Sequence, residues 1–129
     1  MKQYFPNISK IEFEGPDSKN PLAFKHYSAD EEVMGKKMSE HLRFAACYWH
    51  SFMNLGSDPF GGDTIIREYN TGGSEMEIAE NTMHAAFEFF TKLGVDFWCF
   101  HDRDIAPEAE TLAETNKRLD QIVDLAEKL

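Results

Sequence analysis

The sequence has no long apolar run and few basic residues. No uninterrupted apolar stretch of its 129 residues approaches the roughly 20 that a helix needs to span a bilayer, and its first residues lack the apolar core of a secretion signal. Thirteen Lys and Arg stand against 23 Asp and Glu, which gives a net charge of −10. Such a charge repels a phosphate backbone and an anionic membrane surface. We therefore expect a cytoplasmic protein with no nucleic acid and no membrane partner.

Cysteine is also scarce. The chain has two, Cys47 and Cys99, and both stand inside apolar runs rather than among turn residues. This placement favours two reduced, buried thiols over a disulfide or a metal-binding pair. We expect neither of them to carry chemistry.

Apolar residues, by contrast, are plentiful. Hydrophobic residues make up 42% of the chain and aromatic residues 13%, a composition typical of a folded core, and the length suits a single domain. We divide it into residues 1–42 and residues 43–129. In the first part, the turn-rich EGPDSKNP predicts an extended arm that lies on another surface. A capping box of Ser28 and Glu31 predicts a short helix that runs to about Met38.

The first strand and helix are expected after residue 42. Apolar residues run continuously from Phe44 to Trp49, which favours a buried strand within residues 43–52, although a buried helix stays an alternative. A second capping box then begins at Ser74, apolar residues follow at three- and four-residue steps, and Gly94 stands where the helix would end.

A second strand and a second helix follow. The run DFWCFH at 96–101 predicts a strand, and Pro107 marks the entry of a final amphipathic helix. Apolar strands that alternate with amphipathic helices indicate an α/β fold with parallel pairing. Because a (β/α)8 TIM barrel takes about 250 residues and eight strands, we predict a partial one: an N-terminal arm plus the first two β–α units. Two strands alone would leave both sheet edges bare.

Ionisable residues follow the second strand directly, as HDRD at 101–104. In parallel α/β folds the carboxyl ends of the strands face the active site, which makes His101 a catalytic candidate. Asp104, three residues on, is placed to orient the imidazole as a base. Because His-x-x-Asp is a short and common pattern, a solvated loop with no function stays an alternative. A hydrolase built on these two residues would lack a nucleophile elbow.

Two aromatic residues are candidates for the substrate site. Trp49 would stand near the carboxyl end of the first strand and wall an apolar slot, although a core position is the alternative. Phe60 lies in a loop of glycine, proline and polar residues, where an exposed aromatic side chain often anchors a contact with another chain.

Several long motifs resemble one known family. PDSKNPLAFKHY, MSEHLRFAACYWHSF, DPFGGDT and CFHDRDIAPE, with LAETNKRLD after them, are similar to the N-terminal part of the bacterial xylose isomerases of the longer class, which carry an N-terminal arm. The similarity extends over most of residues 10–125.

The resemblance implies a TIM barrel, usually a homo-oligomer, that isomerises D-xylose to D-xylulose and glucose to fructose. The sugar ring is opened and a hydride is shifted with the help of two divalent cations (Mg, Mn or Co). By resemblance, His101 helps to open the ring and Asp104 orients it. Trp49 lines the hydride-shift site, and Phe60 reaches into a neighbouring subunit's site.

The family's metal ligands lie on later strands, so the resemblance implies that this chain binds no metal and is an inactive N-terminal fragment. Its partners would be an aldose or ketose sugar in the full enzyme, further copies of itself, or the missing part of the barrel. The alternative is a non-catalytic module that self-associates or complements that missing part.

Overall fold

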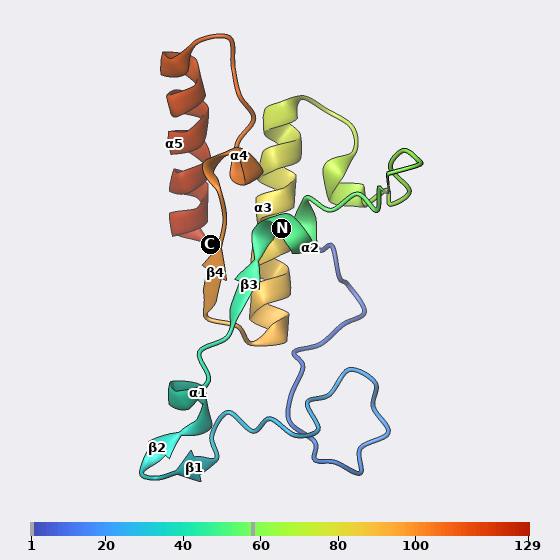
Figure 1. The fold of residues 1–129 in the computed structure, drawn as a ribbon, viewed down its shortest axis with the longest axis vertical. Helices are drawn as coiled ribbons and strands as arrows, with labels where there is room; N and C mark the ends of the chain where they lie inside the picture. The colour runs from blue at the N-terminus through green and yellow to red at the C-terminus, as the bar shows by residue number, and fades with distance from the viewer. Residues whose placement is uncertain (1, 58) are drawn as a thin grey trace.

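Two parallel strands stand at the centre of the fold. The computed structural model describes residues 2–57 and 59–129. Strand β3 (Ala45–Cys47) pairs in parallel with β4 (Phe97–Cys99), in a register that sets Ala46 beside Trp98 and Cys47 beside Cys99. Helix α3 (Glu75–Leu93) connects the two strands, and α5 (Leu112–Lys128) comes after the second (Figure 1). The chain is therefore a mixed α/β structure, in the predicted order of strand, helix, strand and helix.

Helix α3 has the predicted ends. The Ser74 hydroxyl accepts a hydrogen bond from the Glu77 amide at 3.3 Å, and the Glu77 carboxylate accepts one from the Ser74 amide at 2.7 Å. At the other end Gly94 has a φ of 74°, a left-handed conformation that favours glycine, and its amide donates to the Phe90 carbonyl at 2.9 Å. The capping box and the terminal glycine were both predicted correctly.

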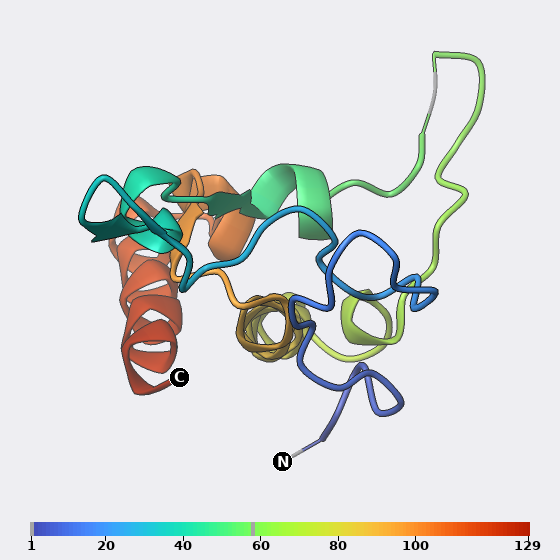
Figure 2. The ribbon, with the colours of Figure 1, turned by 90° about the horizontal axis from the view of Figure 1, so that it is seen from below.

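The core lies where α3 meets the strands and the other helices. In Figure 2 α3 is seen nearly along its axis, with β3 and α2 (Tyr48–Phe52) on one side of it and the N-terminal residues on another. Two side chains with no exposed surface, Met83 of α3 and Ile122 of α5, belong to this core. Trp98 contacts it from β4, with its ring centroid 5.8 Å from that of Phe90.

The N-terminal residues are bound to the outside of α3. The Glu88 carboxylate accepts hydrogen bonds from the amides of Tyr4 at 2.7 Å and Phe5 at 3.1 Å. The Lys92 ammonium lies 2.7 Å from the same carboxylate, and the Lys92 carbonyl accepts from the Ile11 amide at 2.7 Å. The arm is therefore held by the Glu88 carboxylate and by the backbone carbonyl of Lys92, both on α3.

The predicted helix from Ser28 is wrong. Residues 32–37 form a hairpin of β1 (Glu32–Val33) and β2 (Lys36–Lys37), and the helix α1 is limited to Met38–His41. The turn residues of this hairpin, Met34 and Gly35, have φ values of 53° and 77°. Two successive left-handed residues form a hairpin turn and interrupt any right-handed helix.

The predicted strand at 43–52 and the entry of the last helix also need correction. The strand ends at Cys47, and Tyr48–Phe52 form α2, so the helical alternative holds for that half. Tyr48 and Phe52, four residues apart, are both buried, as on one face of a helix. The last helix begins at Leu112 rather than at Pro107, because Thr111 caps it by accepting from the Glu114 amide at 3.2 Å.

The strand pair is covered on one face. Because side chains alternate along a strand, Trp98 points to α3 while its neighbour Cys99 points away from it. Cys99 is exposed and Cys47 is half-buried, and both are free thiols. The prediction of buried thiols is therefore wrong, since the described residues place no element over this face.

Among the helices that the structure describes, none has the length and apolar character of a membrane span.

Candidate functional site

The candidate site lies at the carboxyl edge of the strand pair. Since β3 and β4 are parallel, the residues that follow them emerge at the same edge. Trp49 follows β3 by two residues, and His101 follows β4 by two. A one-turn helix, α4 (Asp102–Ile105), then carries Asp104.

Asp104 holds His101 through one oxygen. Asp104 Oδ2 lies 2.9 Å from His101 Nδ1 and accepts the His101 amide at 2.8 Å. The Asp104 amide in turn donates to the His101 carbonyl at 3.0 Å. The Asp104 side chain is 17% exposed and that of His101 is 65% exposed, so a sheltered carboxylate positions an accessible imidazole.

This contact fixes the tautomer of the neutral imidazole. An ionised carboxylate can only accept hydrogen bonds, so Nδ1 of His101 carries the proton and Nε2 presents a lone pair. The carboxylate also stabilises the imidazolium that forms when Nε2 takes up a proton. The pair has the arrangement of an oriented general base.

Trp49 lies beside the imidazole. The ring centroids of Trp49 and His101 are 4.5 Å apart, with an interplanar angle of 41°. The predicted wall residue and the predicted base are thus brought together from two strands separated by α3. The Trp49 ring thus places a flat apolar surface next to the accessible imidazole.

Tyr48 is a buried residue next to Trp49 in the sequence, and the sequence analysis did not single it out. Its side chain is 1% exposed, and burial, with smaller contributions from Tyr69 and Asp104, raises the pKa of its hydroxyl far above the usual range. Its ring lies 5.8 Å from that of Trp98. Its four-residue spacing from Phe52 was the signal that could have indicated a buried helix face.

Phe60 differs from these residues in its exposure to solvent. Its side chain is 99% exposed, and the loop that carries it extends away from α2 and α3 (Figures 1 and 2). That it reaches into a neighbouring subunit's site stays a prediction.

The described residues do not fit a pair of divalent cations. Nowhere among residues 2–57 and 59–129 does a group of three or more His, Cys, Asp or Glu side chains gather that could hold a metal ion. Two ligands such as His101 and Asp104 leave a metal site incomplete.

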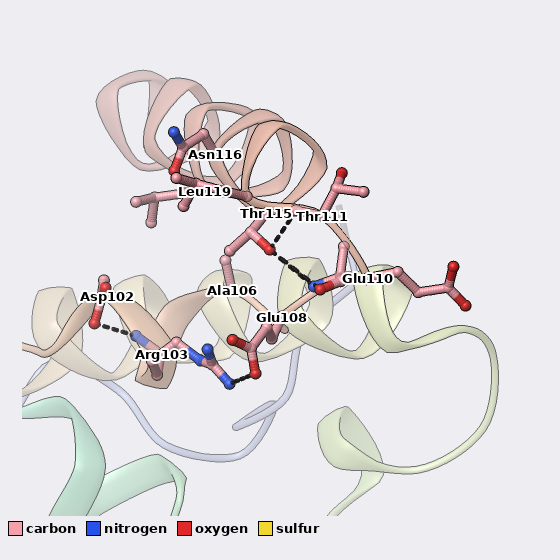
Figure 3. A pocket seen from close by; sticks show the side chains of 11 residues that line it. Asp102, Arg103, Ala106, Glu108, Glu110, Thr111, Thr115, Asn116 and Leu119 are labelled. Atoms are coloured by element: carbon pink, nitrogen blue, oxygen red, sulfur yellow. Dashed lines mark hydrogen bonds and ion pairs between the residues drawn. The ribbon is translucent and has the colours of Figure 1, made fainter.

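A cavity of about 270 Å³ lies next to the candidate site, between α4 and α5 (Figure 3). Its lining includes Arg103, whose Nη2 lies 2.5 Å from Oε2 of Glu108, and Thr115, whose hydroxyl accepts from the Ala109 amide at 3.0 Å. These polar groups are already paired with each other, and the lining contains neither His101 nor Trp49. The cavity is therefore separate from the candidate site.

The fold and the site define a strand–helix segment of the α/β class, with His101 and Asp104 paired at the carboxyl edge of its strands. No family model matches the chain. Curated relatives do. The chain is 60% identical over 125 residues to a xylose isomerase of Geobacillus kaustophilus, 52% identical over 126 residues to one of Arabidopsis thaliana, and 52% identical over 125 residues to one of Pseudomonas fluorescens.

These alignments cover 97%, 98% and 97% of the chain, but only 28%, 26% and 28% of the relatives. The chain thus spans somewhat more than a quarter of the length of the curated relatives it matches. By sequence it is similar to the N-terminal part of these xylose isomerases. The resemblance noted from the motifs is confirmed.

Proposed function

We propose that the chain forms the first two strand–helix units of a (β/α)8 barrel whose activity is the isomerisation of D-xylose to D-xylulose, and of glucose to fructose. The observation that carries the proposal is the meeting of His101, Asp104 and Trp49 at the carboxyl edge of two parallel strands. The names of the relatives support the same activity.

The proposed task of His101 is ring opening. A closed aldose opens when its anomeric hydroxyl loses a proton, the bond from C1 to the ring oxygen breaks, and the ring oxygen gains a proton. Nε2 of His101 takes the first proton, and the imidazolium, held by Asp104, returns one to the ring oxygen. A positioned acid–base group of this kind contributes typically 10²–10⁴-fold.

The two aromatic residues have proposed roles in substrate binding. Trp49 lines the apolar wall against which the opened sugar lies. Phe60, fully exposed on its loop, extends into the site of a second subunit, so the working protein is a homo-oligomer. We place this homo-oligomer in the cytoplasm.

The hydride shift itself needs groups from outside this chain. The family uses two divalent cations, which act as Lewis acids at sugar oxygens, and the described residues do not hold them. The chain by itself is therefore proposed to be inactive. A non-catalytic module is not favoured, because the matched relatives are enzymes by name.

The experiment is a chimera. Residues 1–129 replace the aligned segment of the Geobacillus kaustophilus xylose isomerase, with which they share 60% identity, and conversion of xylose is measured with Mg²⁺. We expect the chimera to be active and the 129-residue chain alone to convert no xylose. In the chimera His101→Asn should lower kcat/KM about 10²-fold, whereas His26→Asn, at an exposed histidine of the arm, should leave it unchanged.

A folded chimera without turnover would contradict the proposal. Metal-dependent turnover by the chain alone, verified by intact mass, would contradict the statement that the chain is inactive by itself.

A further inference from the structure

The rings of Trp49 and His101 meet at the carboxyl edge of the strand pair. Their centroids lie 4.5 Å apart, and the interplanar angle is 41°. Trp49 follows β3 and His101 follows β4, and the parallel register of these strands sets Cys47 beside Cys99, two residues before each ring. The contact is therefore made between residues of this chain and needs none from outside it.

This contact leaves the nitrogens of the imidazole to other partners. Nδ1 of His101 lies 2.9 Å from Oδ2 of Asp104, and the ring N–H that makes this bond points outward in the plane of the ring. Trp49 packs against the π system of the same ring. The imidazole is thus held by a carboxylate at one edge and by an indole, and the contact with the indole does not use Nε2.

The strength of the contact depends on the charge of the imidazole. An indole has a negative face, and a cation within about 6 Å of its centroid is attracted to that face. A neutral imidazole gains little from this attraction, whereas an imidazolium gains all of it. A sugar that covers the two rings excludes water, and interactions between charges strengthen when water leaves.

We propose that Trp49 acts on the isomerisation through His101, because its indole face stabilises the imidazolium that forms when Nε2 takes the proton of the anomeric hydroxyl. The proton later passes from Nε2 to the ring oxygen of the sugar, so that none is gained or lost. This role goes beyond that of a wall, in which Trp49 touches the sugar alone. The inference rests on the proposed function.

The other ionisable groups near the two rings provide a control. Asp104 stabilises the imidazolium from the Nδ1 edge and does so without Trp49. The Arg103 guanidinium is already paired with the Glu108 carboxylate. His50 is a second imidazole against the same indole, with its ring centroid 5.2 Å from that of Trp49. Substitution of His50 therefore tests whether the effect belongs to His101.

The test is a double-mutant cycle in the chimera, with kcat/KM for xylose measured in Mg²⁺. Trp49→Leu keeps an apolar wall and removes the π face. We expect it to lower kcat/KM by a factor about 2- to 30-fold larger when His101 is present than in the His101→Asn background. Trp49→Phe keeps a weaker π face and should show a smaller coupling. In a His50→Asn background the full cost of Trp49→Leu should remain.

The possible outcomes separate this inference from the proposed function. If Trp49→Leu costs the same factor with and without His101, the inference is overturned and the proposed function stands, since Trp49 is then a wall alone. If the leucine variant does not fold, as its thermal midpoint would show, the cycle with Trp49→Phe is read in the same way. A fully active His101→Asn chimera would contradict the proposed function, and the inference would fall with it.

Discussion

Nδ1 of His101 lies 2.9 Å from Oδ2 of Asp104, and the same carboxylate oxygen accepts the His101 backbone amide at 2.8 Å. One side chain thus fixes both the ring and the backbone of the residue it orients. The short helix α4 makes this possible, because it brings a residue three positions later back to the strand end.

Removal of the Asp104 carboxylate should allow the neutral His101 ring to adopt both tautomers. In the unsubstituted protein we expect the neutral His101 ring to carry its proton on Nδ1, and in Asp104→Ala we expect the mixture of tautomers of a free imidazole. Long-range ¹H–¹⁵N correlation spectra of the ring nitrogens measure this. Asp102→Ala is the matched control, because Asp102 accepts from the Arg103 amide. An Asp104→Ala spectrum with the ring unchanged would contradict the assignment.

Loss of the cap at Ser74 should destabilise α3. Ser74→Ala removes the hydroxyl that accepts the Glu77 amide and should lower the free energy of unfolding by about 1 kcal/mol. Ser74→Asp keeps an acceptor at the same place and should have little effect. Urea unfolding followed by circular dichroism measures both. If the two substitutions cost the same, the cap contributes nothing.

Substitution of Gly94 should cost more than substitution of another open glycine. A Cβ at Gly94 would meet only Lys10 Cε at 3.8 Å, so the cost comes from its φ of 74° and amounts to about 1–2 kcal/mol. A Cβ at Gly62 would meet nothing within 4 Å, and no left-handed φ occurs there. Gly62→Ala is therefore the control, with a change within about 0.5 kcal/mol. Equal thermal shifts for the two alanine variants would refute the strain argument.

Packing of α5 against the core should depend on Ile122. Its side chain has no exposed surface, whereas Leu112 on the same helix is 77% exposed. We expect Ile122→Ala to lower the free energy of unfolding by about 2–4 kcal/mol and Leu112→Ala to change it by less than about 0.5 kcal/mol. Chemical denaturation of both variants provides the comparison. A small loss at Ile122 would mean that α5 is not part of the core.

Attachment of the arm should weaken in acid. Burial opposes the effect, but hydrogen bonds from Lys92 and from the Tyr4 and Phe5 amides lower the pKa of Glu88 below its usual value of 4.5. A lowered pKa in the folded state means that the stabilisation is complete above about pH 4.5 and is lost as the pH falls through the folded value.

Glu88→Gln should therefore cost about 1–2 kcal/mol at pH 7, and the difference from the unsubstituted protein should shrink towards about pH 3. Urea unfolding at the two pH values measures it, and hydrogen exchange of the Tyr4 and Phe5 amides localises it. A difference that does not depend on pH would contradict the role of the carboxylate.

Local signals explain which parts of the fold could be predicted from the sequence. Helix α3 was predicted with both ends because Ser74, Glu77 and Gly94 act within one turn of where they stand. The run at 43–52 was only half predicted, since a continuous apolar run has no period that separates a strand from a buried helix. Its second half bends into α2 because Tyr48 and Phe52 bury together.

The failed predictions also came from local signals, which other residues nearby in the sequence overrode. The capping box at Ser28 was overridden by the left-handed Met34 and Gly35, and the helix expected at Pro107 was delayed by the cap at Thr111. Of the candidate site, the pair of His101 and Asp104 follows from spacing alone. The contact of His101 with Trp49 depends on the register of β3 and β4, which the sequence does not specify, and the roles of all three residues stay predictions.

The proposed role of His101 in ring opening is tested most directly by comparing two substrates in the chimera with and without His101→Asn. D-xylose closes into a pyranose ring, whereas D-glyceraldehyde is too short to do so. If His101 opens the ring, the substitution lowers kcat/KM about 10²-fold for xylose and leaves it nearly unchanged for glyceraldehyde. An equal loss for both substrates would contradict ring opening as the task of the base at the carboxyl end of β4.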